Sequence, residues 1–197
     1  FGIAVAILVG SILVAGQIAY YSVPFIEPPG KMYSVVGTEI HMYCTGPEIN
    51  DLPTIIIISG GGTPSSVYHN LQETLSKTTR TCSYDTAGIG WSQANDVPYA
   101  TKNMSDELRQ LLQTAQIDGP IILAGHSMGG IVSLIYSSEH EDQVAGIAFI
   151  DSSHYNQYHY FGQEYNDEIY RTHKELLSTF WIEEAIVKIG ILTLLGG

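Results

Sequence analysis

Residues 121–130 read Ile-Ile-Leu-Ala-Gly-His-Ser-Met-Gly-Gly. The short apolar run at the start is typical of a strand buried on both faces, and the residues from Met128 onward predict a helix. Between them, residues 125–129 fit the pattern G-x-S-x-G. A strand that turns into a helix at one residue forces Ser127 into a strained backbone conformation, and the two glycines remove side chains that would collide there. The pattern predicts a reactive serine at the carboxyl edge of a sheet, and a merely structural tight turn is the alternative.

Strands and helices alternate on both sides of this motif. Because the turns between them are short, the fold class is α/β, a mostly parallel sheet with helices on both faces. Apart from the strand and helix around Ser127, strands are expected at residues 31–36, 39–44, 55–58, 81–85 and 144–150, and helices at residues 65–77 and behind Thr101 as N-cap.

The N-terminal segment differs from the rest of the chain. Residues 1–26 contain no charged side chain, and residues 3–20 are apolar apart from Ser11 and Gln17. A helix that spans a bilayer needs about 20 such residues. We therefore expect a single-pass membrane anchor at residues 1–26, with the side of the membrane undetermined. A cleaved secretory signal is the alternative, although its apolar region is usually only about 7–15 residues long.

Composition excludes some functions and divides the chain. With a net charge of −12 and only 8 Lys and Arg, the chain lacks the basic surface of a nucleic-acid binder. The two cysteines do not have metal-ligand spacing, so neither a metal nor a cofactor is expected. We expect a core over residues 27–151 and a polar, helical insertion over residues 152–197. Since the chain begins with Phe1 and ends in an apolar run, we also expect it to continue at both ends.

Several segments resemble the α/β-hydrolase family. Residues 125–130 resemble its nucleophile elbow, and residues 84–92, Tyr-Asp-Thr-Ala-Gly-Ile-Gly-Trp-Ser, are similar to the loop after its fourth strand. Residues 28–31 with 41–46, and residues 149–154, resemble a membrane-anchored branch of the family. One departure is Thr86, where this branch usually carries arginine. The resemblance implies an α/β-hydrolase fold whose last strands are missing from these residues.

The resemblance also implies an active site. Ser127 would be the nucleophile, and the backbone N–H groups of Gly61 and Met128 would form the oxyanion hole. On sequence alone, the glycines at 60–62 would also fit a simple flexible loop. The family places the acid and the base of its triad after strands that this chain does not contain. Within the chain, Asp151 is a weaker candidate for the acid and His154 for the base; a loop cap and a surface residue are the alternatives.

These expectations favour a membrane-anchored serine hydrolase that transfers the acyl group of a small-molecule ester or amide through Ser127. A segment without a base would show little turnover. The alternative is a non-catalytic, hydrolase-like subunit of a membrane assembly, with other membrane subunits as partners. A ligand-binding receptor is a third reading. The lipid bilayer, contacted through residues 1–26, is an expected partner of both the membrane-anchored hydrolase and the non-catalytic membrane subunit.

The family resemblance also places the two cysteines close together. Its strand order sets the second strand beside the fourth, so Cys44 and Cys82 would face each other across one ladder. In an extracytoplasmic domain they would form a disulfide. Asn103, in the sequence Asn103-Met104-Ser105, would then be a glycosylation acceptor.

Overall fold

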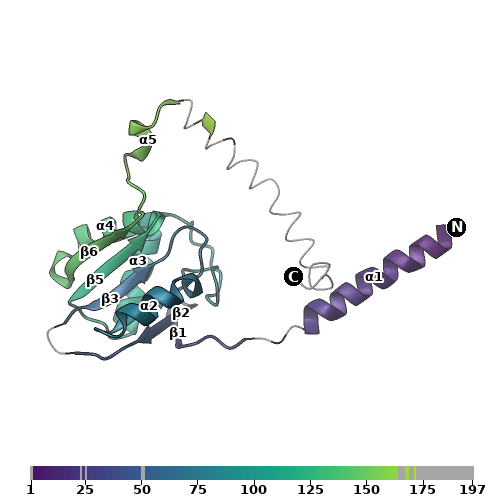
Figure 1. Ribbon diagram of the computed structural model, residues 1–197, viewed down its shortest axis with the longest axis horizontal. Coiled ribbons are helices and arrows are strands. Elements are labelled where there is room, and N and C mark those ends of the chain that lie inside the picture. Colours follow the sequence, from purple (N-terminus) through teal and green to yellow (C-terminus); the bar gives the residue numbers. More distant parts are fainter. Residues whose placement is uncertain are drawn as a thin grey trace. The chain divides into compact units, whose positions relative to one another are not determined.

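The computed structural model describes residues 2–22, 24, 26–49, 52–163, 167–168 and 171. The chain forms two compact units, of which one is Pro28–Gln157. The other takes residues from both ends, Phe1–Glu27 and Tyr158–Gly197. Every strand that the described residues form belongs to the first unit (Figure 1). Ser127 belongs to the same unit.

The described part of the chain forms a six-stranded sheet in the order β1-β2-β4-β3-β5-β6. The first two strands pair antiparallel, β2 pairs antiparallel with β4, and β4, β3, β5 and β6 run parallel. The expected mostly parallel sheet is therefore confirmed. The strands are β1 (Lys31–Val35), β2 (Thr38–Thr45), β3 (Thr54–Ile58), β4 (Thr81–Tyr84), β5 (Ile121–His126) and β6 (Val144–Ile150).

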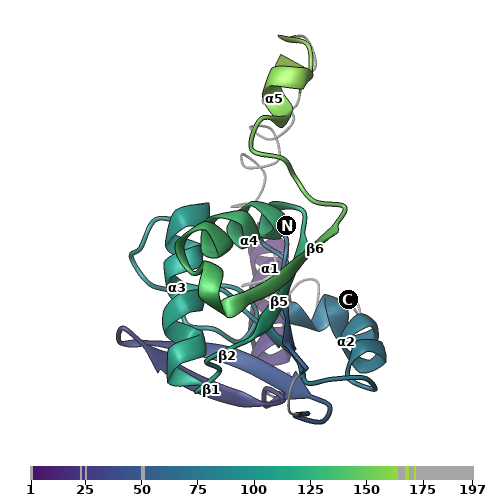
Figure 2. The ribbon, with the colours of Figure 1, turned by 90° about the vertical axis from the view of Figure 1, so that its left-hand side faces the viewer.

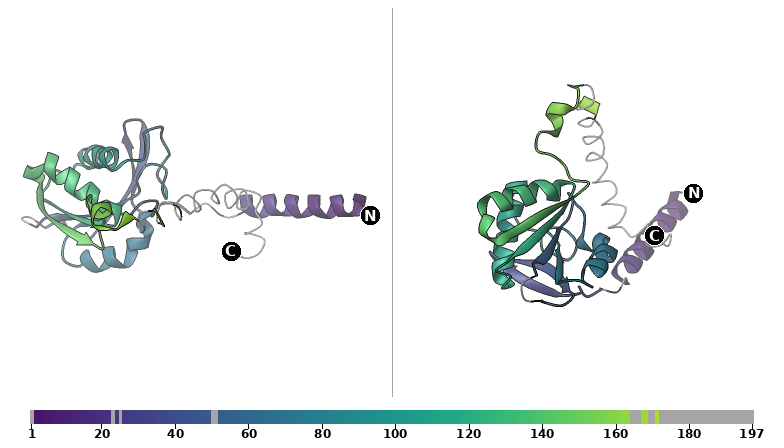
Figure 3. Two further views of the ribbon diagram at one scale, coloured as in Figure 1. Left: turned by 90° about the horizontal axis from the view of Figure 1, so that it is seen from above. Right: turned by 60° about the vertical axis from the view of Figure 1, so that its left-hand side comes forward.

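Helices cover both faces of the sheet. The view in Figure 2 shows α3 and α4 on one face and α2 on the other, and both panels of Figure 3 agree. The expected arrangement is confirmed, although Thr101 is the first residue of α3 and not its cap. The helical segments of this unit are η1 (Ser65–Tyr68), α2 (His69–Leu75), α3 (Thr101–Thr114), α4 (Met128–Glu139) and η2 (Glu141–Gln143).

The central strand β3 shows why the two layers form. Ile56, Ile57 and Ile58 have no solvent exposure. Because successive strand residues point to opposite faces, Ile56 and Ile58 pack in the core that contains the apolar residues of α3 and α4, whereas Ile57 packs with Tyr68 on the α2 side. Burying one such side chain stabilises the fold by about 1.5–3 kcal/mol. A wholly apolar run is therefore placed in the middle of the sheet.

The second unit contains α1 (Gly2–Ser22), so the helix expected near the N-terminus is confirmed. Among the described residues, however, no helix combines the length and the apolarity that crossing a membrane requires. The expected passage of residues 1–26 through a membrane is thus not confirmed. The short helix α5 (Gln157–Tyr160) begins where the first unit ends.

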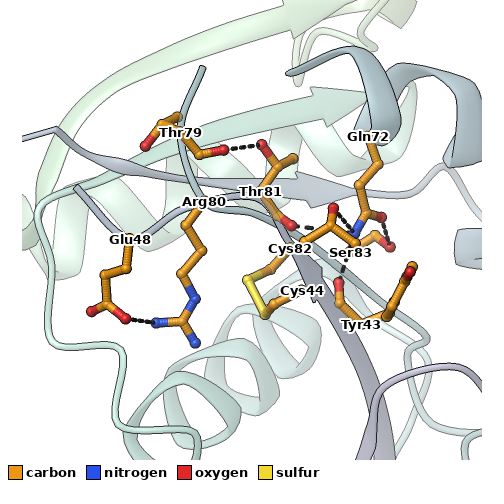
Figure 4. Close-up of a disulfide and its surroundings, with 10 residues drawn as sticks. Tyr43, Cys44, Glu48, Gln72, Thr79, Arg80, Thr81, Cys82 and Ser83 are labelled. Atoms are coloured by element: carbon orange, nitrogen blue, oxygen red, sulfur yellow. Dashed lines mark hydrogen bonds and ion pairs between the residues drawn. A yellow bond between two sulfur atoms is a disulfide. The ribbon is translucent and has the colours of Figure 1, made fainter. Parts of the chain in front are cut away.

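A disulfide joins the antiparallel and the parallel parts of the sheet (Figure 4). Cys44 of β2 lies directly opposite Cys82 of β4, with 4.0 Å between their Cα atoms, and their sulfurs are bonded. The expected proximity is confirmed. Beside the disulfide, Gln72 Nε2 of α2 donates hydrogen bonds to the carbonyl oxygens of Tyr43 and Thr81, one on each strand. The link between β2 and β4 is therefore both covalent and hydrogen-bonded.

Asn103 is not placed as a glycosylation acceptor should be. It lies inside α3, and its side-chain Nδ2 donates a hydrogen bond to Pro98 O at 2.8 Å. Ser105, the third residue of the motif, is fully buried. Because an acceptor site must be accessible on the surface, this geometry argues against modification of Asn103.

Loss of the disulfide should destabilise the fold. The bond spans 38 residues, and the chain-entropy relation assigns such a loop about 4 kcal/mol of stability. The double variant Cys44→Ala, Cys82→Ala should lose up to that amount in urea-induced unfolding monitored by circular dichroism. As a control, the variant and the wild type should have similar stability under reducing conditions. Equal stability under oxidising conditions would contradict the pairing.

Candidate active site

Ser127 occupies the turn between β5 and α4. Its backbone has φ 51° and ψ −122°, a conformation that non-glycine residues rarely adopt. The turn is held on the β6 side, because Ser127 O accepts a hydrogen bond from Ser153 N at 2.9 Å and Ser127 N lies 3.4 Å from Ile150 O. The expected placement of Ser127 in a strand-to-helix turn at the carboxyl edge of the sheet is confirmed.

Close backbone contacts explain the two glycines of the motif. A Cβ atom on Gly125 would lie 2.6 Å from Gly129 O, which is far inside van der Waals contact. A Cβ atom on Gly129 would overlap Ile58 O at the end of β3. The first contact arises within the serine turn, as the sequence predicts. The second arises because α4 begins against the neighbouring strand, which the local sequence does not reveal.

The glycine loop after β3 leaves one backbone N–H available. Gly60 N donates to Tyr68 Oη at 3.3 Å, and Gly62 N donates to Tyr99 Oη at 3.0 Å. Between them, Gly61 N has no hydrogen-bond partner in the part of the chain that the structure describes. The loop is therefore held on both sides of Gly61.

This loop borders the serine turn directly. A Cβ atom on Gly60 would lie 3.2 Å from Ser127 Cβ, and one on Gly61 would lie 3.3 Å from Met128 Cε. The structure thus brings three of the residues expected in the site, Gly61, Ser127 and Met128, to one edge of the sheet. Met128 is the first residue of α4, so its N–H has no acceptor within the helix.

Three residues next to the site were not predicted from the sequence. The hydroxyl of Tyr68 lies 2.8 Å from His126 Nδ1 while it accepts the Gly60 N–H, so it links the glycine loop to the serine turn. Tyr99 reaches the same loop from the segment before α3. Neither tyrosine belongs to a motif, and Tyr68 is 58 residues from His126 while Tyr99 is 37 residues from Gly62, so no local pattern indicates these contacts.

Asp151 and His154 follow β6 at the same edge of the sheet. Asp151 adopts a positive φ of 42°, and its side chain is exposed. His154 is also exposed, and its Nδ1 accepts a hydrogen bond from Asn156 N at 3.1 Å. No hydrogen bond joins Ser127 Oγ to His154 or to any other histidine that the structure describes. The assignments of Asp151 as acid and His154 as base therefore stay predictions from the sequence.

A buried carboxylate organises the loop after β4. Asp85 Oδ2 lies 2.9 Å from His41 Nδ1, with both side chains fully buried, and also accepts the Trp91 N–H. Its Oδ1 accepts the Ser65 N–H at 2.6 Å. Burial alone would raise the pKa of Asp85, but these hydrogen bonds outweigh it and lower the pKa. The ionised Asp85 ties β2, η1 and the loop together.

A second carboxylate lacks such compensation. Glu107 of α3 accepts the Ala87 N–H at 3.3 Å and lines a cavity of about 470 Å³ together with Thr86. Burial raises the pKa of Glu107 to about 7, and the hydrogen bond from Ala87 offsets only part of this. Burial, followed by the charge of Glu107, also raises the pKa of Tyr84.

No group of three or more His, Cys, Asp or Glu side chains within the described ranges is arranged to hold a metal ion.

Ser59 directly follows β3 at this edge of the sheet. Its buried Oγ has no hydrogen-bond partner among the described residues. The site is therefore built from a serine, backbone N–H groups and tyrosine hydroxyls.

The α/β-hydrolase fold family model matches residues 53–182, which is more than half of the chain. The chain therefore belongs to the α/β-hydrolase family. The match contains the glycine loop, the loop after β4 and the serine turn. The resemblance seen in the sequence is confirmed.

Curated relatives are similar over part of their length. A protein of Schizosaccharomyces pombe with no described function is 27% identical in an alignment of 154 positions that covers 64% of this chain and 29% of the relative. A Gibberella zeae protein named for the AB hydrolase superfamily is 30% identical over 51% of this chain and 33% of its own length. An uncharacterised vacuolar membrane protein of Saccharomyces cerevisiae is 30% identical over 41% of this chain and 13% of its own length. The chain thus spans a third or less of these proteins.

Solved structures show the same fold. An enol-lactonase from Burkholderia xenovorans is 28% identical, with a TM-score of 0.58 over 62% of this chain and 47% of the enzyme. A bacterial membrane phospholipase A is 22% identical, with a TM-score of 0.58 over 75% of this chain and 45% of that protein. The second likeness concerns the fold alone.

The stability of the protein should depend on pH through Glu107. The pKa of Glu107 is about 7 in the folded state and about 4.3 in an unfolded chain. The protonated carboxyl therefore makes its full contribution to the stability of the fold below pH 4.3, and this contribution is lost as the pH rises through 7. Because Glu107 is partly exposed, the loss should be about 1–2 kcal/mol. Urea unfolding of Glu107→Gln between pH 4.5 and 8 should lack this decline.

The exposed Glu141 provides the matched control for this measurement. Glu141→Gln should retain the wild-type dependence of stability on pH. If Glu107→Gln and Glu141→Gln behave alike, the decline does not come from Glu107.

Proposed function

We propose that this chain is the core of a membrane-associated serine hydrolase in which Ser127 attacks the carbonyl carbon of a small-molecule ester or amide. One observation carries the proposal: Ser127 is held at a positive φ against the loop of Gly60–Gly62, in which the Gly61 N–H has no partner within the described residues. A strained serine beside an unpaired donor is the arrangement that acyl transfer requires.

The chemistry follows from these groups. Attack by Ser127 Oγ converts the carbonyl oxygen into an oxyanion and forms a bond to the carbonyl carbon. The N–H groups of Gly61 and Met128 stabilise the oxyanion, with the N-terminus of α4 adding its favourable dipole. A histidine must take the proton from Oγ. Since no described histidine is hydrogen-bonded to Ser127 Oγ, we place the base outside the described residues, in agreement with the chain order serine, acid, histidine of this family.

Membrane association is the second part of the proposal. It is supported by the absence of charged side chains in residues 1–26 and by exposed apolar side chains on α1, such as Val9, Ile12 and Ile18. One relative is named a vacuolar membrane protein and another a probable transporter, which agrees with a bilayer as partner. The proposal concerns attachment to the membrane, and it leaves the substrate within the ester and amide class.

Replacement of the nucleophile should abolish reactivity. In the full-length protein, Ser127→Ala should reduce labelling by a fluorophosphonate probe and hydrolysis of p-nitrophenyl esters by at least about 1,000-fold. The control is Ser138→Ala, an exposed serine on the same helix, which should react like the wild type. Wild-type protein that is folded but does not react would favour a non-catalytic, hydrolase-like subunit of a membrane assembly.

Charge on α1 should weaken membrane attachment. Ile12→Asp places an ionised carboxylate on an exposed apolar position and should move most of the protein from the membrane pellet to the supernatant after centrifugation. The control is Val36→Asp, at an exposed position in the turn between β1 and β2, which should sediment like the wild type. Equal sedimentation of the two variants would contradict attachment through residues 1–26.

A further inference from the structure

We propose that Tyr68 and Tyr99 are positioning residues that hold the Gly60–Gly62 loop in the conformation in which the Gly61 N–H faces the serine site. The inference rests on the proposed function for its catalytic consequence, but its structural content does not depend on that function. It assigns a role to two residues that lie outside every motif of the chain.

The first argument is the distribution of hydrogen bonds along the loop. The N–H before Gly61 and the N–H after it both donate to a tyrosine hydroxyl, at 3.3 Å for Gly60 and 3.0 Å for Gly62. A glycine-rich segment has many accessible backbone conformations, so it needs external partners to keep one of them. The two tyrosines supply those partners and leave Gly61 between them without one.

Tyr68 does more than hold the loop, because it also connects the loop to the nucleophile turn. Its hydroxyl accepts the Gly60 N–H and lies 2.8 Å from His126 Nδ1, and His126 directly precedes Ser127. The hydroxyl proton is then available for Nδ1, which requires the Nε2–H tautomer of His126. One hydroxyl therefore fixes the separation between the proposed oxyanion donor and the proposed nucleophile.

The two tyrosines are themselves held by rigid neighbours. Tyr68 is buried and ends η1, whose first residue, Ser65, donates its N–H to the buried Asp85. Tyr99 is about half exposed, at 51%, but the segment that carries it is fixed by the hydrogen bond from Asn103 Nδ2 to Pro98 O. Tyr68 is thus the more rigidly held of the two residues, and Tyr99 is the more accessible one. Together we call them the tyrosine clamp, because their hydroxyls accept the Gly60 and Gly62 N–H groups on either side of Gly61.

Amide hydrogen exchange tests the clamp directly. Gly60 is the residue of the sequence's single Ser-Gly dipeptide, so labelling with ¹³C-carbonyl serine and ¹⁵N-glycine isolates its amide resonance. In the full chain, Tyr68→Phe should raise the exchange rate of the Gly60 amide by about tenfold, and Tyr99→Phe should do the same for Gly62, as expected when one hydrogen bond of a local structure is lost. Tyr33→Phe, a partly buried tyrosine of β1, is the control and should change neither rate.

Reactivity of the full-length protein tests the consequence. A displaced oxyanion donor lowers the rate of the chemical step more than it weakens substrate binding, so kcat for ester hydrolysis should fall by about 10- to 100-fold with KM nearly unchanged. The kcat of Tyr99→Phe should fall less than that of Tyr68→Phe, because Tyr99→Phe leaves the hydrogen bond between Tyr68 and His126 intact. Tyr99 is half exposed, so its variant should fold even if Tyr68→Phe is destabilised.

The outcomes separate the two proposals. Unchanged exchange at Gly60 and Gly62 in the tyrosine variants would overturn the clamp. Faster exchange together with wild-type kcat would overturn its positioning role. If wild-type protein shows no Ser127-dependent reaction, the proposed function fails, whereas the exchange rates still decide whether the tyrosines hold the loop.

Discussion

The close approach of the serine turn to the end of β3 constrains the geometry around Ser127. Because the first turn of α4 lies against Ile58 O, no side chain can be placed at residue 129. The strand that carries Ile58 is central, with β4 on one side and β5 on the other. Any shift of the serine turn would therefore disturb the core on both faces of the sheet. The strained backbone of Ser127 is maintained by this packing, since strain persists only where the surroundings enforce it.

The buried Asp85 adds a second constraint that acts on the loops. A charge without compensation in a protein interior is costly, but this carboxylate receives hydrogen bonds from His41, Ser65 and Trp91. These partners come from β2, from η1 and from the loop after β4. Since η1 ends with Tyr68, the same carboxylate that joins the strands to the loop also anchors the segment that reaches the glycine loop.

The sequence predicted those features that depend on short segments. The strand from Ile121, the turn at Ser127 and the helix from Met128 follow from a contiguous pattern, and the structure shows them where they were expected. The Cys44–Cys82 contact came from family strand order, because the two residues alone carry no pairing information. The contacts of Tyr68 with Gly60 and His126 could not be predicted, since the tyrosine is 58 residues from His126 and belongs to no repeat or motif. The base could not be placed from the sequence either, because a catalytic histidine is recognised by its geometry relative to the serine, which no local pattern carries.

Thr86, the one departure from the family pattern in this loop, lines the same cavity as Glu107. The branch that this chain resembles usually carries arginine there, and a guanidinium would favour the ionised form of a nearby carboxylate. With threonine in its place, the hydrogen bond that Glu107 accepts within the described residues comes from the Ala87 N–H, and burial raises the pKa of Glu107 to about 7. Two carboxylates therefore hold the same loop, but their pKa values are shifted in opposite directions. The pKa of Asp85 is lowered, so it stays ionised and holds the beginning of the loop at neutral pH, whereas Glu107 is only partly ionised there and holds Ala87 less strongly.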